Sequence, residues 1–382
     1  MSVEQFTAAT GPFTGGPTGH DKGAVLSVDL AALADNWRLI AARSPRSACA
    51  AVVKADAYGL GLETVVPALM KAGCGTFFVA HLDEARRVRQ IDANAHIYVL
   101  NGLPVGCSQN FAEIEARPVL CSTDEVFEWA GFLRSSGWRG GAALQIDTGM
   151  NRLGVSVDQA RDLSRAVDRP PFSLVMTHLA CAEQPDHPLT LRQREVFEVV
   201  RRWFPSTPAS IANSSGVFLP GNAALDLVRP GYALYGGNPT PDARNPMRNV
   251  VTLEGRIIQV RDVAVGDTVG YGAAWTAKRP TRIAIVSLGY ADGYLRSASW
   301  EDGHPGAEAS IADSRRPIIG RVSMDMVAVD VTGISEVDVR RGAYIQFIGP
   351  DMPIDDVARR AGTIGYELLT RLGSRLQRVT KS

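Results

Sequence analysis

The stretch AVVKADAYGLG, residues 51–61, places a lysine where an apolar run ends. The preceding AVV has the composition of a strand that is buried on both faces. A lysine is rarely buried unless it is paired or takes part in chemistry. We therefore expect Lys54 to lie at the carboxyl end of a core strand, followed by a loop that contains Tyr58 and two glycines.

Short apolar runs of this kind recur along the first two thirds of the chain. They alternate with amphipathic segments such as LETVVPALMKAG and LDEARRVRQID. Strands that alternate with helices form parallel βα units, and eight of them in roughly 200 residues predict a TIM-like (β/α)8 barrel. The eight runs are 49–53, 76–80, 96–100, 118–120, 142–146, 174–177, 210–212 and 225–228.

A polar residue follows each of these runs. In a parallel barrel the carboxyl ends of the strands converge on the active-site face. Some strands simply end where polarity begins, but that does not explain why lysine, histidine and arginine recur at these positions. We expect a polar rim made of Lys54, His81, Asn101, Ser122, Asp147, His178, Asn213 and Arg229.

The pattern changes near residue 247. The later segments are rich in β-branched residues, alternate in polarity and are punctuated by glycine, which is typical of antiparallel strands. We predict a barrel over residues 24–247 and a mainly antiparallel β-domain over 248–382. Residues 1–23 read as a flexible tail, because they are rich in glycine, threonine and proline. They have neither the cationic start nor the apolar core of a signal peptide, so none is expected.

Composition excludes several classes of partner. The chain has 382 residues with 40 basic and 40 acidic side chains, and zero net charge disfavours nucleic acid and anionic membranes as partners. No apolar run approaches the roughly 18 residues of a membrane span. The five cysteines form no CxxC pair, which favours reduced thiols and a cytoplasmic location.

The lysine has companions that indicate a phosphate-bearing cofactor. Burial lowers the pKa of a lysine amine and suits it to Schiff-base chemistry, although an ordinary ion-paired lysine is the alternative. NSS at 213–215 and RPGYALYGG at 229–237 follow late strands, where barrel enzymes often hold a phosphate with backbone N–H groups. Gly231 allows close approach and Ser214 adds a hydroxyl. Because no nucleotide motif occurs, we predict pyridoxal phosphate.

A metal is not expected. The segment HLACAEQPDH, residues 178–187, gathers two histidines, a cysteine and two carboxylates. Their spacing fits no standard zinc pattern. We interpret this segment as a loop over the active site.

Eight motifs, in order, resemble those of the alanine racemase family, and the resemblance covers the chain from Ala24 to its C-terminus. It implies a homodimer with composite active sites that interconverts L- and D-alanine. The reaction would use two bases and an external aldimine of pyridoxal phosphate, and would supply D-alanine for peptidoglycan. The motifs are AVVKADAYGLG, IDTGMNRLG, THLA, NSSG, RPGYALYG, VGYGAAW, GYADGY and GRVSMD.

The resemblance also implies the two bases. Lys54 would carry the cofactor and serve as the base on one face of Cα, and Tyr271 in VGYG is similar to the base on the opposite face. Racemisation needs such a pair, because a proton removed from one face must be returned on the other. A phenol is a poor base at neutral pH unless cations stabilise the phenolate. His178 and Arg229 are the family's candidates for that coupling.

Further roles follow from the resemblance alone. Arg229 matches the partner of the pyridine nitrogen; since arginine only donates, it would keep that nitrogen unprotonated. Arg152 would bind the cofactor's phenolic oxygen and the substrate carboxylate, and Met324 would contact this carboxylate through its backbone N–H. The other cofactor-binding residues would be Tyr58, His178, Asn213, Ser214, Gly231, Tyr232 and Tyr366, and the access channel would be lined by Tyr290, Arg321 and Asp325.

The sequence departs from the family at one site position. Many members carry a carbamylated lysine two residues before the aspartate of DTGM, and this chain has Gln145 there. A neutral amide cannot supply the negative charge of the carbamate. We therefore expect Arg152 to be held by a bound anion such as chloride or by other contacts.

Three other functions compete with this interpretation. A racemase of broader range, acting on serine or lysine, would share the scaffold and differ in pocket width. A basic-amino-acid decarboxylase would use an acidic partner for the pyridine nitrogen, which Arg229 contradicts. A non-catalytic pyridoxal-phosphate-binding homeostasis protein would resemble the barrel half only.

Overall fold

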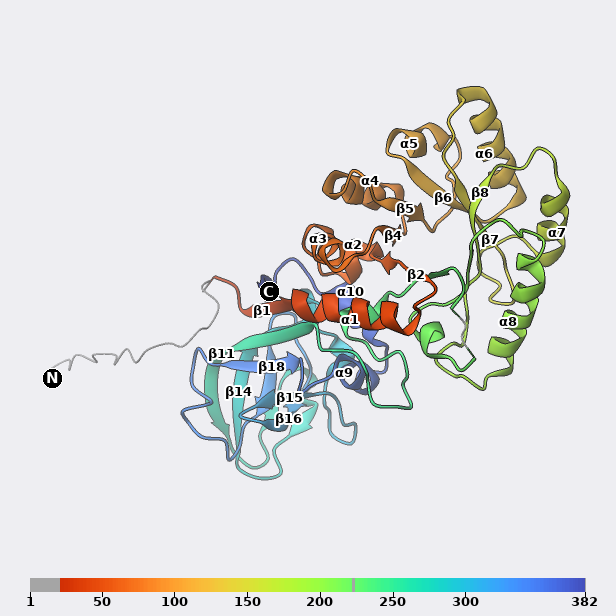
Figure 1. Cartoon of the computed structure of the whole chain (residues 1–382). Coiled ribbons are helices and arrows are strands. Elements are labelled where there is room, and N and C mark those ends of the chain that lie inside the picture. Colours follow the sequence, from red (N-terminus) through yellow and green to blue (C-terminus); the bar gives the residue numbers. More distant parts are fainter. Residues whose placement is uncertain (1–20, 222–223, 382) are drawn as a thin grey trace, which may run out of the picture.

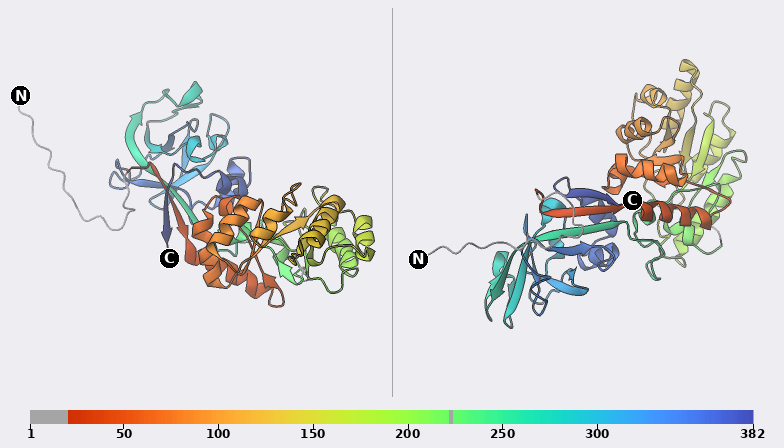
Figure 2. Two further views of the ribbon diagram at one scale, coloured as in Figure 1. Left: turned by 90° about the horizontal axis from the view of Figure 1, so that it is seen from above. Right: turned by 60° about the vertical axis from the view of Figure 1, so that its left-hand side comes forward.

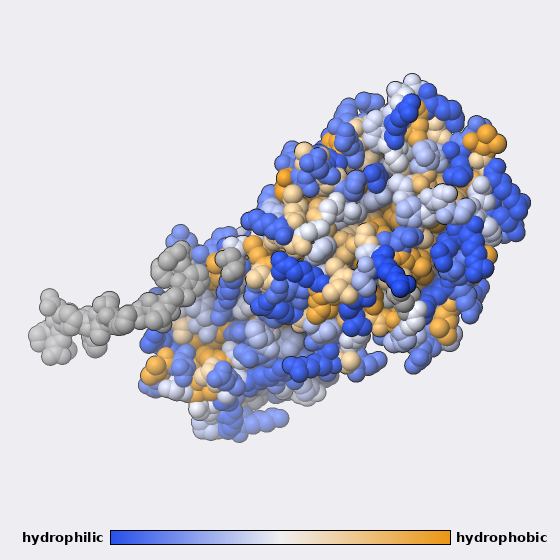
Figure 3. Space-filling view, in the orientation of Figure 1, coloured by the Kyte–Doolittle hydropathy of each residue, from blue (hydrophilic) through white to orange (hydrophobic). Residues whose placement is uncertain are grey.

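The computed structural model describes residues 21–221 and 224–381 and shows a barrel beside a β-domain (Figure 1). The tail predicted over residues 1–23 lies outside the described residues, except for its last three positions. In the described part of the chain, no helix is long and apolar enough to cross a membrane. The face shown in Figure 3 is mostly hydrophilic, with hydrophobic side chains interspersed.

The first domain is built on a curled parallel sheet. Seven strands follow one another in chain order, each paired in parallel with the next. Their central residues are buried on both faces, as the continuous apolar runs predict. The strands are β3 (Ala51–Val52), β4 (Thr76–Val79), β5 (His96–Val99), β6 (Ala116–Leu120), β7 (Ala142–Gln145), β8 (Phe172–Met176) and β9 (Ala209–Ser210).

An eighth strand closes this sheet into a barrel. β10 (Leu227–Val228) pairs in parallel with β2 (Ala48–Cys49), which leads into β3. On its other side the Arg229 amide donates to the Ala212 carbonyl at 2.9 Å, which joins β10 to the end of β9. The predicted (β/α)8 barrel is therefore confirmed, including its two short last strands.

Helices surround the barrel, and several of them begin at a side-chain cap. Asp29 accepts from the Ala32 amide at 2.7 Å and caps the first helix. The last two strands are followed by the short 3₁₀ turns η1 (Ser215–Phe218) and η2 (Tyr232–Tyr235) in place of long helices. The longer helices are α1 (Leu30–Arg43), α3 (Leu62–Ala72), α4 (Leu82–Ile91), α5 (Ser108–Glu113), α6 (Thr123–Ser136), α7 (Val157–Arg165) and α8 (Pro188–Arg201).

The second domain is a β-barrel with antiparallel pairing, which confirms the predicted antiparallel domain. Its longest strand, β11 (Val251–Val263), pairs with β14 on one side and β18 on the other, and four further pairings complete the ring. Two helices and a small hairpin are attached. The elements are β14 (Thr281–Ser287), β15 (Glu308–Ile311), β16 (Ser314–Ile319), β17 (Val327–Asp330), β18 (Tyr344–Ile348), β12 (Thr268–Val269), β13 (Trp275–Thr276), α9 (Ile354–Arg360) and α10 (Gly365–Arg371).

The first strand of the chain belongs to this second domain. β1 (Ala24–Asp29) pairs antiparallel with β11 and parallel with β19 (Gln377–Lys381), and Figure 2 shows it beside those strands. The predicted range of the barrel, 24–247, includes this strand, so the structure differs there. The reason is that the backbone hydrogen bonds of β1 are made with residues more than 200 positions away, which no local pattern reveals.

A buried asparagine ties the two domains together. Asn36 on α1 is 1% exposed, and its amide donates to the carbonyls of Leu234 (3.2 Å) and Arg248 (3.0 Å). It also accepts from the Arg248 amide at 2.7 Å. Since a buried amide without partners is costly, these bonds fix α1 against η2 and the start of the β-domain.

The placement of β1 gives a test of stability. Leu26 is fully buried in β1, whereas Leu191 on α8 is 50% exposed. Leu26→Ala should lower the free energy of unfolding by about 2–5 kcal/mol, because it removes apolar contacts and leaves a cavity. Leu191→Ala should change it by less than about 0.5 kcal/mol. Urea denaturation of both variants measures this; equal losses would contradict the placement of β1 in the core.

Candidate active site

A cavity of about 690 Å³ opens at the carboxyl ends of the barrel strands. Six of the eight residues predicted for the polar rim line it. The other two are helix caps: His81 is the N-cap of α4, and Ser122 accepts from the Glu125 amide at the start of α6. The six lining residues are Lys54, Asn101, Asp147, His178, Asn213 and Arg229.

The backbone after Lys54 forms a left-handed turn. Ala55, Asp56, Ala57 and Tyr58 have φ values of 54°, 53°, 54° and 54°, so the element labelled α2 (Lys54–Tyr58) is not an ordinary α-helix. Left-handed geometry costs an L-residue about 1–2 kcal/mol relative to the right-handed form. Such strain persists only where surrounding contacts impose it, often at functional sites.

The glycines after this turn serve the packing of the two domains. Gly59 has φ +82°, and a Cβ there would lie 2.4 Å from the Leu369 carbonyl oxygen on α10. Gly61 has φ +97° and precedes α3. Both positions therefore require glycine, which explains the YGLG sequence after the lysine.

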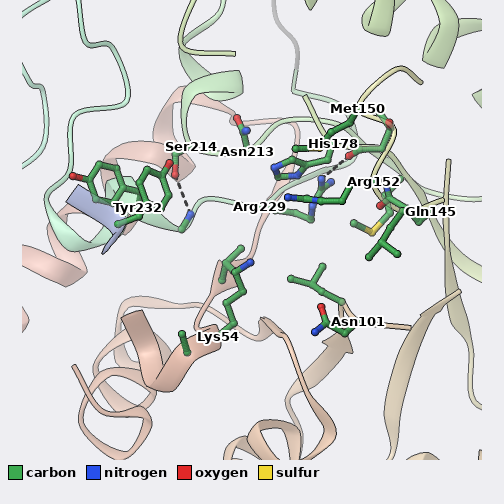
Figure 4. Close-up of a pocket in the computed structure, with 18 of the residues that line it drawn as sticks. Lys54, Asn101, Gln145, Met150, Arg152, His178, Asn213, Ser214, Arg229 and Tyr232 are labelled. Atoms are coloured by element: carbon green, nitrogen blue, oxygen red, sulfur yellow. Dashed lines mark hydrogen bonds between the residues drawn. The ribbon is translucent and has the colours of Figure 1, made fainter. Parts of the chain in front are cut away.

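The Lys54 amine lies on one side of the cavity, opposite Arg152, His178 and Arg229 (Figure 4). Burial lowers the pKa of Lys54, the positive charge of Arg152 lowers it further, and the carboxylate of Glu84 raises it. A lowered pKa increases the fraction of neutral amine, which is the nucleophilic form.

Ser214 and Gly231 form a small cradle at the same cavity. The Ser214 hydroxyl accepts from the amides of Gly231 (3.0 Å) and Ala233 (3.2 Å). A Cβ on Gly231 would lie 2.3 Å from the Tyr58 hydroxyl oxygen, so glycine is required for that approach. The Tyr58 ring stacks on Tyr235 at 4.6 Å, and burial raises the pKa of the Tyr58 phenol, which keeps it a hydrogen-bond donor.

The β-domain completes this side of the cavity. Tyr366 on α10 lines the cavity and stacks on Tyr232 with ring centroids 3.9 Å apart. The Tyr232 hydroxyl donates to Asp355 on α9 at 2.7 Å, and the second oxygen of Asp355 accepts from the Asn238 amide at 2.9 Å. Asp355 was not among the predicted site residues, because its link to the cradle is not local in sequence.

Arg229 is a buried cation next to a neutral imidazole. It is 3% exposed, donates to the Thr177 carbonyl at 2.6 Å and bonds the Ser210 hydroxyl. Burial lowers the pKa of Arg229 to about 10, so it stays charged at neutral pH. Burial, together with Arg229, Arg152 and Lys54, lowers the pKa of His178 to about 3. Of the two residues predicted to stabilise a phenolate, only Arg229 carries positive charge at neutral pH.

Arg152 faces the cavity without a carboxylate partner among the described residues. Gln145 lines the same cavity and is 8% exposed, and its amide nitrogen donates to the Ile146 carbonyl at 3.3 Å. The side chain that replaces the carbamylated lysine is thus neutral and directed in part at the backbone. A bound anion beside Arg152 stays a prediction.

The two histidines of the segment HLACAEQPDH have different roles. His178 lines the cavity, whereas His187 accepts from the Leu189 amide and caps α8. Within the described ranges, no three His, Cys, Asp or Glu side chains gather as a metal site requires.

Of the predicted site residues in the β-domain, the structure brings Tyr366 to this cavity but not Tyr271 or Met324. Tyr271 is 73% exposed and Met324 is 52% exposed. The three residues predicted for the access channel also lie away from the cavity lining: Tyr290 is 43% exposed, Arg321 pairs with Glu301, and Asp325 pairs with Arg375.

The sequence analysis also missed a buried carboxylate beside the lysine. Glu84 is 8% exposed and accepts from backbone amides of three segments, one of which is the turn after Lys54. The available signal was a capping pattern, with Glu84 three residues after the N-cap His81. That pattern predicts the helix start but not the contact with the turn.

Both halves of the chain match known families. Residues 28–239 match the alanine racemase N-terminal domain, and residues 250–380 match the alanine racemase C-terminal domain. The chain belongs to the alanine racemase family. Alanine racemases are isomerases that depend on pyridoxal phosphate.

Individual alanine racemases are similar over nearly the whole chain. The protein from Methylobacterium nodulans is 52% identical over 358 residues, or 93% of this chain and 95% of that protein. The alanine racemase from Bartonella henselae, whose crystal structure holds covalently bound pyridoxal phosphate, is 34% identical. Its TM-score is 0.88 over 94% of this chain and 99% of that one. The biosynthetic alanine racemase from Pseudomonas aeruginosa is 35% identical, with a TM-score of 0.86 over 94% of this chain and 100% of that one.

The cavity fits the cofactor of the alanine racemases. Lys54 supplies an amine with a lowered pKa, and Arg152 and Arg229 supply positive charge for an anionic ligand. Ser214 offers a hydroxyl to the cavity, and the lack of a Cβ at Gly231 leaves room beside the Tyr58 hydroxyl. These are the features that a small phosphorylated aldehyde requires.

The lowered pKa of His178 predicts a pH-dependent stability. The folded state binds this proton less readily than the unfolded chain, whose histidine pKa is about 6.5. Hence the free energy of unfolding should fall as the pH falls, by at most about 2 kcal/mol between pH 7 and pH 5. His178→Asn should remove this part of the pH dependence in the cofactor-free protein, and His304→Asn, at an exposed histidine, should keep it. Urea denaturation at both pH values measures the difference; identical profiles for the two variants would contradict the assignment.

Proposed function

We propose that this chain racemises alanine with pyridoxal phosphate bound at Lys54. The observation that carries the proposal is the position of Lys54, whose amine with its lowered pKa faces Arg229 and lies in one cavity with the cradle at Ser214. The family match and the overlap with a structure that holds covalent pyridoxal phosphate support it.

Each residue of the cavity has a distinct task in this proposal. The Ser214 hydroxyl, the backbone at Gly231 and the Tyr58 phenol would hold the phosphate. Arg229, which stays charged, would donate to the pyridine nitrogen and keep it unprotonated. When bound, pyridoxal phosphate supplies an electron sink for the carbon that loses its proton.

Proton transfer needs a base on each face of the substrate carbon. The Lys54 amine lies on one wall of the cavity and would hold or release the proton there. Arg152 would bind the substrate carboxylate, which fixes the substrate between the two bases. Among the described residues, we assign no other titratable group to the second face of the substrate carbon. We assign the base on that face to Tyr271.

Tyr271 would reach the cavity from a second subunit. It lies at the start of η3 (Tyr271–Ala273) in the β-domain, near Arg321 and Met326, which line the same small surface pocket. The exposed Tyr290 and Met324 adjoin this pocket, since the Tyr290 amide donates to the Ser323 carbonyl at 3.0 Å. A cluster of exposed large apolar side chains marks an interaction surface. In a twofold dimer this surface would cover the barrel mouth of the partner.

The competing functions fit less well. A homeostasis protein that resembles the barrel alone does not account for the match over residues 250–380. A carboxylate partner for the pyridine nitrogen, as in a decarboxylase, is not available where Arg229 lies. We propose alanine as the main substrate, a cytoplasmic location and a role in supplying D-alanine for peptidoglycan. A biosynthetic relative that is similar over 94% of this chain supports the last of these. Assays with serine and lysine would measure substrate breadth.

The cofactor assignment is tested by chemical trapping. Borohydride reduction of the purified enzyme should fix pyridoxal phosphate on Lys54, because this amine is the nucleophile of the cavity. Peptide mapping by mass spectrometry locates the label, and Lys54→Ala should carry none. Label on another lysine, such as Lys71 on α3, would overturn the assignment.

The shared site is tested by mixing two inactive variants. Lys54→Ala should lose racemisation in both directions, and Tyr271→Phe should lose about 10²–10⁴-fold in rate, because each lacks a base. After subunit exchange half of the dimers are mixed, and each mixed dimer has one intact site, so up to about a quarter of wild-type activity should return.

Each variant mixed with itself is the control for this experiment. Mass spectrometry of the intact dimers verifies that subunits have exchanged. Exchange without any return of activity would show that both bases come from one chain.

A further inference from the structure

We propose that Glu84 and Arg87 on α4 form a clamp on Asp56 that holds the left-handed turn after Lys54 and so positions the Lys54 amine. Both are positioning residues, because they act through the turn and do not line the cavity. The inference rests on the proposed function in one respect, namely that Lys54 is the residue that carries the cofactor.

The Glu84 side chain binds the backbone of the turn. One carboxylate oxygen of Glu84 accepts from the Asp56 amide at 3.3 Å, and the other accepts from the amides of Ala80 (2.8 Å) and His81 (3.2 Å). A single buried carboxylate thereby joins the turn, the end of β4 and the start of α4. Since β4 is the neighbour of β3 in the barrel, the turn is tied to the rigid sheet.

Arg87 binds the side chain of Asp56, the residue whose backbone amide Glu84 binds. Its guanidinium donates to Asp56 Oδ1 at 2.6 Å and forms a two-bond pair with Glu63 at 2.8 and 2.7 Å. Asp56 Oδ1 also accepts from the Leu62 amide at 3.1 Å. Asp56 is therefore fixed at its amide by one residue of α4 and at its carboxylate by another.

The turn needs such a clamp because its geometry opposes the local preference of its residues. Ala55, Asp56, Ala57 and Tyr58 are all L-residues with positive φ, and none of them gains from that conformation by itself. A relaxed turn would move the Lys54 amine and also the Tyr58 hydroxyl, which fits against Gly231. The charge of Glu84 supports the same role, because it raises the pKa of Lys54.

The chain offers a matched control for Glu84. Glu125 lies at the equivalent place of α6, where its carboxylate accepts from the Cys121 amide at 2.6 Å at the end of β6. It has the same relation to its strand and its helix as Glu84, but two strands, β4 and β5, separate its strand from β3. Glu84→Gln and Glu125→Gln thus make the same chemical change, but only Glu84→Gln alters a contact to the turn.

The first measurement is hydrogen exchange in the cofactor-free enzyme. A glutamine has one acceptor oxygen, so it cannot serve Ala80, His81 and Asp56 together, and its NH₂ group would face a donor. Exchange of the Asp56 amide should become about tenfold faster or more in Glu84→Gln and change less than about twofold in Glu125→Gln. Mass spectrometry of a peptide that begins before residue 54 and extends through residue 60 reports it without any need for catalysis.

The second measurement is the kinetics of the holoenzyme. Misplacement of a reacting group lowers the rate of the chemical step more than it weakens substrate binding. Glu84→Gln should lower kcat about tenfold or more with KM changed less than about threefold, and Glu125→Gln should leave both within about twofold. Equal exchange and equal kinetics in the two variants would show that Glu84 only caps α4, and would overturn the clamp.

A second pair of variants covers the case in which Glu84→Gln does not fold. Arg87 is partly exposed, with 38% of its side chain accessible, so Arg87→Met should fold and should also speed exchange of the Asp56 amide. Arg86→Met, at the neighbouring position of α4, is its control and should not change that exchange. Equal exchange in these two variants would likewise overturn the clamp.

Borohydride labelling separates this inference from the proposed function. If the label in the wild-type enzyme lies away from Lys54, the proposed function fails, and the positioning role of the clamp fails with it. If the label lies on Lys54 and the exchange of Asp56 does not respond to Glu84→Gln, only the clamp fails.

Discussion

Four consecutive L-residues in left-handed conformation, directly after Lys54, constrain the rest of the site. The turn aims the lysine at the cavity and at the same time presents the Tyr58 hydroxyl to Gly231. Neighbouring contacts must offset its unfavourable backbone geometry. They come from α4 through Glu84 and from α10, where the Leu369 carbonyl approaches Gly59. Both domains of the chain therefore meet on this one turn.

The charges around the cavity follow from the same arrangement. Lys54, Arg152 and Arg229 converge from three different strand ends, so each cation raises the cost of protonating its neighbours. The outcome is a lysine with a lowered pKa and a neutral His178 beside an arginine that stays charged. A site of this kind favours ligands with several negative groups, such as a phosphate and a carboxylate, and the lowered pKa of Lys54 increases the fraction of neutral amine that a carbonyl cofactor can react with.

The two domains divide the proposed chemistry between them. The barrel and α10 enclose the cofactor side of the cavity, whereas Tyr271 and Met324 lie exposed on the β-domain of the same chain. An exposed apolar cluster that includes a tyrosine of assigned function is consistent with a surface that a partner subunit covers. On this view one fold supplies two half-sites, and dimer formation assembles them.

Local sequence patterns determined much of this protein. Continuous apolar runs predicted the barrel strands, and alternation and glycine predicted the β-domain, because these features depend on periods of a few residues. The residues that follow the apolar runs included Lys54, Ser214 and Gly231, and the resemblance of ordered motifs added Arg152 and Tyr366; the structure brings all five to one cavity. Tertiary structure alone decided three other features: that β1 joins the β-domain, that Tyr271 lies away from Lys54 within one chain, and that Ala55–Tyr58 turn left-handed. Each depends on partners distant in sequence, and the turn runs against the intrinsic preference of its own residues, so only the contacts of the folded chain could specify it.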